Sequence, residues 1–181
     1  MGHSSSIRNF DLARRFLFAL LIFATASSIA PAGAAQITIV AVGASNTYGK
    51  GVARGADFPA QLQAMLRARG YDARVINAGI NGDTTAGMRA RLSSAVPAGT
   101  QLVILQPGGN DRRKGIAAGR EGNIAGIVAA LNARKIKVIT IERILSGLEQ
   151  HLQPDGQHLT AQGYGIVAER LVPQVVAAIR K

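Results

Sequence analysis

Short apolar runs alternate along this chain with segments whose apolar residues recur at helical spacing, and this alternation constrains the fold more than any other feature. The apolar runs predict strands at residues 37–42, 75–76, 102–105 and 137–141. The segments with helical spacing lie at residues 57–69, after Asp83, at residues 124–131 and after Thr160. Strands and helices that alternate over short links predict a doubly wound α/β domain with a parallel sheet and right-handed crossovers.

The composition suits strands that helices bury on both faces. Hydrophobic residues make up 48% of the 181 residues and aromatic residues only 4%, so Val, Ile, Leu and Ala must build the core. Between Ile141 and Asp155 the chain has room for a loop or one helical turn, but not for another strand and helix. We therefore expect one domain with a parallel sheet of about four strands.

Single residues predict where the helices begin and end. Gly70 follows the first helix at the position of a C-terminal cap, whereas Asp83 and Thr160 are the expected N-caps of the second and the last helix. Pro173 should kink or restart the last helix, because proline cannot donate a hydrogen bond in a helix interior.

Residues 1–35 predict a secretory signal peptide. Three arginines precede an apolar stretch at residues 16–30, and small residues follow at residues 32–35. The apolar stretch is too short and too rich in Ala and Ser for a membrane span, although an uncleaved anchor is the alternative. Cleavage would leave a mature domain at residues 36–181, and we expect it to be secreted or periplasmic.

The charge balance indicates a class of partner. The formal net charge is +11, and because the leader contributes three Arg and one Asp (+2), the mature domain keeps +9. Such a domain favours anionic membrane or cell-wall surfaces. The cations are dispersed without interleaved aromatic residues, so nucleic acid is not an expected partner. The chain has no cysteine, which excludes thiol catalysis and a cysteine-based zinc site.

Polar clusters follow three of the expected strands, and a fourth lies near the C-terminus. They read Gly43-Ala44-Ser45-Asn46, Asn77-Ala78-Gly79-Ile80-Asn81-Gly82, Gly108-Gly109-Asn110-Asp111 and Asp155-Gly156-Gln157-His158. Because the carboxyl ends of parallel strands line one crevice, we expect the clusters to converge. Together they supply a hydroxyl, an amide, glycine N–H groups, a carboxylate and an imidazole, which are the parts of a serine hydrolase.

Three of these residues have the spacing of a catalytic triad. A serine hydroxyl is a weak nucleophile without an adjacent base. The structural alternative for Ser45 is a serine that caps a helix. His158 is the base by elimination, because His3 lies in the leader and His151 is expected on a polar loop. Asp155 precedes His158 by three residues, so one turn can bring its carboxylate against the imidazole.

Gly79 and Asn110 fit an oxyanion hole. A glycine lets its N–H face a substrate, and the Asn110 amide is a neutral donor to developing negative charge. The alternative is that both are ordinary turn residues. Asp111 is a second candidate for the triad acid, but we interpret it as a support for the site because Asp155 lies beside the histidine.

The order of these residues resembles that of the SGNH (GDSL-type) hydrolase superfamily, and the resemblance covers nearly all of the mature chain. Residues 77–85 and 108–111 are most similar to its branch of periplasmic acyl-thioesterases, lysophospholipases and arylesterases. The resemblance implies a flavodoxin-like three-layer α/β/α sandwich and no metal or organic cofactor.

The resemblance also implies a role for each residue. It makes Ser45 the nucleophile, His158 the base and Asp155 the acid that orients the base. The oxyanion donors would be the N–H groups of Ser45 and Gly79 and the side chain of Asn110.

Two departures from the family pattern affect these expectations. The family motif Gly-Asp-Ser reads Gly43-Ala44-Ser45 here. The segment of residues 142–154 is shorter than in family members, which usually carry another helix and a fifth strand there. Its shortness predicts a shallower and more open acyl pocket.

These features predict a secreted or periplasmic serine esterase that forms an acyl-enzyme on Ser45. The expected substrates are short acyl, aryl or thio esters, or a lysophospholipid. The alternatives are an esterase that removes O-acetyl groups from an envelope polysaccharide, and a basic envelope-binding protein of the same fold without activity.

Overall fold

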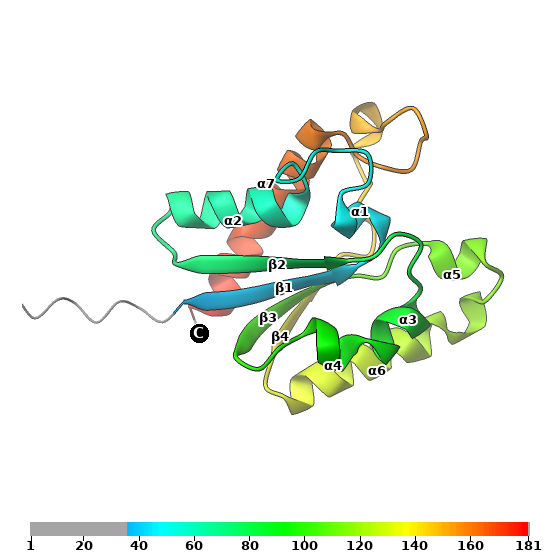
Figure 1. The fold of residues 1–181 in the computed structure, drawn as a ribbon, viewed down its shortest axis with the longest axis horizontal. Coiled ribbons are helices and arrows are strands. Elements are labelled where there is room, and N and C mark those ends of the chain that lie inside the picture. Colours follow the sequence, from blue (N-terminus) through cyan, green and yellow to red (C-terminus); the bar gives the residue numbers. More distant parts are fainter. Residues whose placement is uncertain (1–35, 181) are drawn as a thin grey trace, which may run out of the picture. The chain divides into compact units, whose positions relative to one another are not determined.

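Figure 1 shows the chain as a computed structural model, which describes residues 36–180; the predicted leader lies outside the described residues. A parallel four-stranded sheet, ordered β2-β1-β3-β4, forms the centre. Its strands are β1 (Ile37–Gly43), β2 (Ala73–Gly79), β3 (Thr100–Gln106) and β4 (Lys137–Thr140). The predicted α/β fold with about four parallel strands is confirmed.

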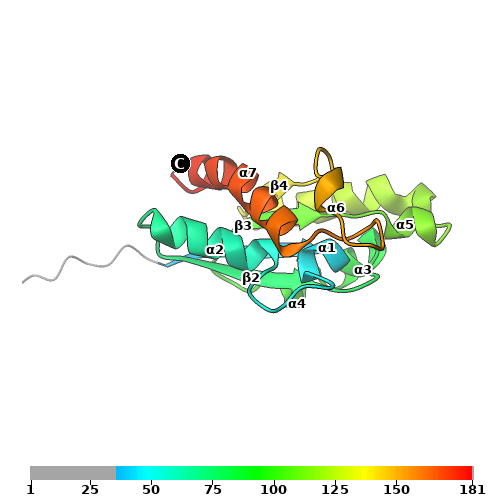
Figure 2. The same cartoon turned by 90° about the horizontal axis from the view of Figure 1, so that it is seen from above.

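Seven helices and two 3₁₀ turns connect and follow these strands in residues 36–180. The helices are α1 (Ser45–Tyr48), α2 (Phe58–Ala68), α3 (Thr85–Ala90), α4 (Leu92–Ala95), α5 (Asn110–Arg113), α6 (Arg120–Ala133) and α7 (Ala161–Ile179). The 3₁₀ turns are η1 (Ala117–Gly119) and η2 (Glu149–His151). Figures 1 and 2 show α2 and α7 on one face of the sheet and α3, α4 and α6 on the other, which gives three layers.

The central strand β1 shows why the chain forms these layers. Ile39 and Ala41 pack into the core under α2 and α7, whereas Val40 and Val42 pack into the core on the opposite face. All four residues are fully buried. Successive side chains of a strand point to opposite faces, so this continuous apolar run requires a helical layer on each side.

Two of the predicted helix ends are confirmed. Gly70 (φ +83°) follows α2, and its N–H donates to the carbonyl of Arg67, while the Tyr71 N–H donates to that of Leu66. This pair of bonds is the glycine-based termination that the sequence indicated. Thr160 caps α7 because its hydroxyl accepts from the Gly163 N–H at 3.2 Å.

The expected N-cap at Asp83 is wrong by one residue. Thr84 caps α3, and its hydroxyl accepts from the Gly87 N–H at 3.2 Å. The Asp83 carboxylate is engaged elsewhere, since it accepts from the Thr84 N–H and pairs with Arg91. The second helix is also interrupted at Arg91, which separates α3 from α4.

Of the two outcomes expected at Pro173, a kink or a restart, the restart is wrong, because α7 continues through Pro173 as a single helix. Pro173 and Glu169, whose carbonyl loses its helical partner, are both exposed, so water can satisfy that carbonyl. The neighbouring Val172 and Val175 are buried in the core and hold the helix in place.

The segment between β4 and α7 contains one 3₁₀ turn, η2, and no further strand of the sheet, as its length predicted. No helix among residues 36–180 combines the length and the apolar character that crossing a bilayer requires.

The three strands that precede polar clusters end at the same level. Gly43, the last residue of β1, is aligned with Gly79 of β2 and with Gln106 of β3. The loops that follow these strands therefore start side by side at the carboxyl edge of the sheet.

Asp57→Ala tests how strongly α2 is anchored. Asp57 is buried, and its Oδ1 accepts from the Ala60 N–H and from the Asn77 amide, each at 3.1 Å. Loss of this cap should lower the free energy of unfolding by about 1–2 kcal/mol, measured by urea denaturation. The control Asp72→Ala removes an exposed carboxylate that, within residues 36–180, accepts a side-chain hydrogen bond from Gln36 alone, and it should change stability by less than about 0.5 kcal/mol. Equal losses in the two variants would contradict a capping role.

Candidate active site

Ser45 lies on a tight turn between a strand and a helix. It is the first residue of α1, and one residue, Ala44, separates it from the end of β1. The turn is compact because the Ala44 carbonyl accepts from the N–H groups of Thr47 and Tyr48. Gly43 is required here, since a Cβ at this position would lie 2.1 Å from the Thr47 hydroxyl oxygen.

The two carboxylate oxygens of Asp155 have different partners. Oδ1 accepts from the backbone N–H groups of Gln157 at 2.9 Å and of His158 at 3.0 Å. These bonds bend residues 155–158 into a turn. Oδ2 lies 2.5 Å from Nδ1 of His158. The spacing of three residues therefore brings one carboxylate against both the backbone and the ring.

The His158 ring connects Asp155 with Ser45. Its Nε2 lies 2.8 Å from the Ser45 Oγ, and both side chains are buried. Because Nδ1 donates to a carboxylate, Nε2 is left to accept from the serine hydroxyl. The structure thus brings the three residues of the predicted triad together in one chain of hydrogen bonds.

The pKa of Asp155 is lowered from its ordinary value of 3.8 to about 2. The largest cause is the hydrogen bond from His158, and the next is the backbone N–H of Gln157. Both favour the ionised carboxylate, so Asp155 keeps its negative charge beside the imidazole over a wide pH range.

Side-chain amides hold the histidine loop against the rest of the domain. The Asn46 amide donates to the Gln157 carbonyl at 3.0 Å, and its oxygen accepts from the buried Tyr164 hydroxyl at 3.0 Å. The Gln153 amide donates to the carbonyls of Lys50 and Leu159. Sequence reasoning missed these two positioning residues, because neither spacing nor residue type separates them from solvated amides.

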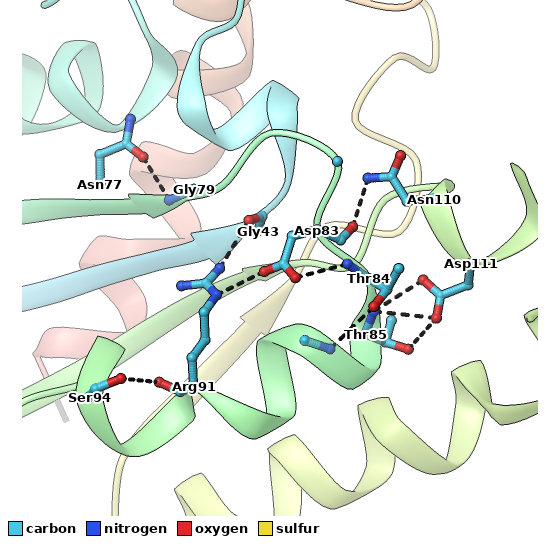
Figure 3. A network of polar contacts seen from close by, with 12 residues as sticks. Gly43, Asn77, Gly79, Asp83, Thr84, Thr85, Arg91, Ser94, Asn110 and Asp111 are labelled. Atoms are coloured by element: carbon cyan, nitrogen blue, oxygen red, sulfur yellow. Dashed lines mark hydrogen bonds and ion pairs between the residues drawn. The ribbon is translucent and has the colours of Figure 1, made fainter. Parts of the chain in front are cut away.

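Asn110 lies at the start of α5 with a fixed side chain. Its Nδ2 donates to the Asp83 carbonyl at 2.7 Å, and its Oδ1 accepts from an Arg113 guanidinium at 2.8 Å. These contacts define the orientation of the amide and leave one N–H of Nδ2 for another acceptor. Figure 3 shows the bond between Asn110 and Asp83.

Gly79 has a different role from the expected one. A Cβ at this position would lie 2.2 Å from the Tyr48 nitrogen, so the glycine allows β2 to pack on the backbone of α1. Its N–H donates to the Asn77 Oδ1 at 2.9 Å (Figure 3) and is therefore not a free donor. By contrast, the N–H groups of Ser45 and Gly82 donate to no atom of residues 36–180. The signal for this difference is Asn77 itself, whose side chain commonly accepts from the backbone two residues on.

Asp111 and His151 lie outside the chain of hydrogen bonds around Ser45. The buried Asp111 carboxylate accepts from the N–H and the hydroxyl of Thr85, at the start of α3. His151 ends the 3₁₀ turn η2 and packs its Cβ toward Gly163.

A cavity of about 1030 Å³ opens beside Ser45 and His158. Its apolar lining includes Ile144, Leu145 and Leu152. Charged side chains line it as well, namely Arg112, Arg113, Arg120, Glu121, Glu142, Arg143 and Glu149. Within residues 36–180, no group of three or more metal-binding side chains is suited to hold a metal ion.

Comparisons with known proteins agree with this geometry. The model of the GDSL-like lipase/acylhydrolase family matches residues 41–172. Esterase TesA of Pseudomonas aeruginosa is 37% identical over 113 residues, which cover 60% of this chain and 55% of the relative. The chain therefore matches about half the length of this curated relative.

Solved structures are similar over most of their length. The crystal structure of TesA has a TM-score of 0.72 and 27% identity, covering 78% of this chain and 99% of that chain. AlinE4, described as an SGNH-hydrolase family esterase, has a TM-score of 0.62 and 27% identity, covering 80% of this chain and 97% of that chain.

Asp155→Asn tests the lowered pKa of the carboxyl. A carboxylate with a lowered pKa stabilises the folded state above its unfolded value of 3.8, and the contribution is lost as the pH falls through about 2. The wild type should therefore be more stable than the variant at pH 7, and the difference should disappear near pH 2, measured by urea denaturation across this range. A difference that is constant with pH would contradict the assignment.

Proposed function

The chain belongs to the GDSL-like lipase/acylhydrolase family, and on this premise we propose that it is a serine esterase acting through an acyl-enzyme on Ser45. The observation that carries the proposal is the chain of hydrogen bonds from Asp155 through His158 to the Ser45 hydroxyl. It ends at a cavity wide enough for an ester substrate. The membership itself confirms the superfamily resemblance of the sequence.

Each residue has a defined step in this reaction. His158 Nε2 takes the hydroxyl proton of Ser45 while Oγ attacks the acyl carbon of the ester. Asp155, ionised beside Nδ1, stabilises the imidazolium that forms. The imidazolium then gives its proton to the leaving alkoxide, which departs as the alcohol. Water, deprotonated by the same histidine, releases the acid and restores the Ser45 hydroxyl.

The oxyanion of the tetrahedral intermediate needs donors that are not already occupied. We assign this role to the Ser45 N–H, the remaining Asn110 amide N–H and the Gly82 N–H, in place of Gly79. Gly82 precedes Asp83, whose carbonyl accepts from the Asn110 amide. The Gly82 carbonyl accepts from the Lys114 ammonium at 2.8 Å. These contacts keep the two donors next to each other.

The proposed substrates are short acyl, aryl or thio esters, or a lysophospholipid, met at a secreted or periplasmic location. The mature charge of +9 supports residence near an anionic membrane or cell wall. A second candidate is the removal of O-acetyl groups from an envelope polysaccharide. Its support is the number of polar and charged groups around the cavity, which suit a hydroxylated sugar.

Ester hydrolysis by the mature domain is the first test. Residues 36–181 should hydrolyse p-nitrophenyl acetate and butyrate, and the activity should be lost in Ser45→Ala and in His158→Ala. A fluorophosphonate probe should label the wild type but not Ser45→Ala. Folded wild-type protein that is neither active nor labelled would favour the binding protein without activity. Acetate release from acetylated glycan, without turnover of the nitrophenyl esters, would favour the second candidate.

Asn110→Ala tests the oxyanion assignment. Removal of one such donor should lower kcat by about 100-fold, with a smaller change in KM, in steady-state assays with p-nitrophenyl acetate. Gln150→Ala, at an exposed position of η2, serves as the control and should leave kcat unchanged. Substitutions at the surface change kcat by up to roughly threefold. If Asn110→Ala keeps kcat within this range of the wild type, Asn110 has no part in the mechanism.

A further inference from the structure

We propose that Arg91 is a positioning residue that holds the nucleophile turn and the Asn110 amide in one geometry. The proposal rests on the proposed esterase function and adds a residue to its machinery. Arg91 touches neither Ser45 nor Asn110, so it acts through the backbone groups that it binds.

Arg91 makes two contacts from the junction between α3 and α4. Its Nε lies 2.8 Å from the Asp83 Oδ2, and its Nη2 donates to the Gly43 carbonyl at 3.2 Å (Figure 3). The Arg91 side chain is only 18% exposed and that of Asp83 only 10%. Little water reaches this pair, so its geometry is better defined than that of a surface ion pair.

The Gly43 contact reaches the nucleophile. Gly43 ends β1 and lies two residues before Ser45. Its carbonyl also accepts from the Ile80 N–H at 3.1 Å. The side chain of Ala44, between Gly43 and Ser45, has no polar group with which to anchor the turn. The guanidinium of Arg91 thus supplies the side-chain contact that position 44 cannot.

The Asp83 contact reaches the oxyanion donor. Oδ1 of Asp83 accepts from the Thr84 N–H at 2.9 Å and Oδ2 binds Arg91, so both carboxylate oxygens are held. Their restraint limits rotation of the Asp83 backbone, whose carbonyl accepts from the Asn110 amide at 2.7 Å. Gly87 makes room for this arrangement, because a Cβ there would lie 2.1 Å from the Asp83 Oδ1.

A neighbouring contact keeps α5 in register with α3. Asp111, the residue after Asn110, binds the Thr85 N–H and hydroxyl. Two consecutive residues of α5 are therefore attached to the segment that begins α3, Asn110 to Asp83 before the cap and Asp111 to the first helical residue. Arg91 links that assembly to the end of β1, so a displacement of the Asp83 backbone would move Asn110 relative to Ser45.

A double-mutant cycle separates this role from simple stabilisation of the fold. Arg91→Met should lower kcat for p-nitrophenyl acetate by about tenfold to a hundredfold, with KM changed less than about threefold, because misplaced groups lose transition-state contacts. In the Asn110→Ala background the same substitution should cost less than about threefold, since residues that act together are not additive. A full, additive loss in that background would overturn the proposal.

Two further variants keep the cycle interpretable. Arg134→Met is the matched control, because the Arg134 guanidinium also donates to a carbonyl, that of Val96, before β3. It should leave kcat and KM unchanged. If Arg91→Met does not fold, Asp83→Asn takes its place, since it keeps the side-chain volume and the main-chain carbonyl but weakens the ion pair. It should give the same loss of kcat and the same non-additivity with Asn110→Ala.

Hydrogen exchange tests the coupling without reference to turnover. In Arg91→Met, amides at residues 43–50 and 108–114 should exchange at least about tenfold faster than in wild type, while those of α7 stay unchanged. Arg134→Met should leave both segments as they are. Unchanged exchange in Arg91→Met would overturn the proposal even if the wild type is an active esterase. If amides in Arg91→Met exchange faster but the wild type hydrolyses no ester, the result counts against the proposed function alone.

Discussion

The alignment of three parallel strands at one edge of the sheet is the constraint on which the rest of the site depends. Gly43 is aligned with both Gly79 and Gln106, so the loops after β1, β2 and β3 leave the sheet at one level. The first loop carries Ser45 and the third carries Asn110, although 65 positions separate these residues in the numbering of the chain. Close packing at this edge explains the glycines: a Cβ at Gly43 would overlap Thr47, and one at Gly79 would overlap Tyr48. The chemistry therefore depends on contacts in which a single methyl group has no room.

Features that depend on residues close together in the sequence could be predicted from the sequence, whereas features that depend on distant residues could not. The layers of the fold follow from the apolar runs, because burial on both faces leaves a periodic signal. The contact between Asp155 and His158 follows from their three-residue spacing, which is a local property, whereas the contact of His158 with Ser45 depends on the fold. Asp83 was misassigned as a cap because its carboxylate binds Arg91, eight residues away, rather than its own helix. Gly79 was misassigned as a donor because the direction of its N–H depends on the Asn77 side chain.

The shortened segment before α7 changes how the histidine is held. A further strand would hold neighbouring backbone with a ladder of hydrogen bonds, but here the sheet ends at β4. Side-chain amides take over: Asn46 binds the Gln157 carbonyl, and Gln153 binds the carbonyls of Lys50 and Leu159. Tyr164, buried on α7, orients Asn46 through its hydroxyl, and its burial raises the pKa of that hydroxyl. These side chains add to backbone bonds across the loop, in which the Gln153 N–H donates to the His158 carbonyl and the Thr160 N–H to the His151 carbonyl. The side-chain contacts, unlike the backbone ones, can each be lost to a single substitution.

The chemistry and the substrate-binding wall are held by interactions of different strength. Ser45, His158 and Asn110 are buried, and their hydrogen bonds lie where water competes little. Across the cavity, Arg120 pairs with Glu121 and with Glu142, whose side chains are 80% and 52% exposed. Exposed ion pairs contribute at most about 1 kcal/mol and are screened by salt. The side chains on this side of the cavity are therefore more easily displaced than the buried residues around Ser45. Acyl preference in this chain is therefore expected to depend on ionic strength and on substitutions at Glu142, while the rate of the chemical step depends on the buried hydrogen bonds. Such a division lets the substrate range change without loss of the triad geometry.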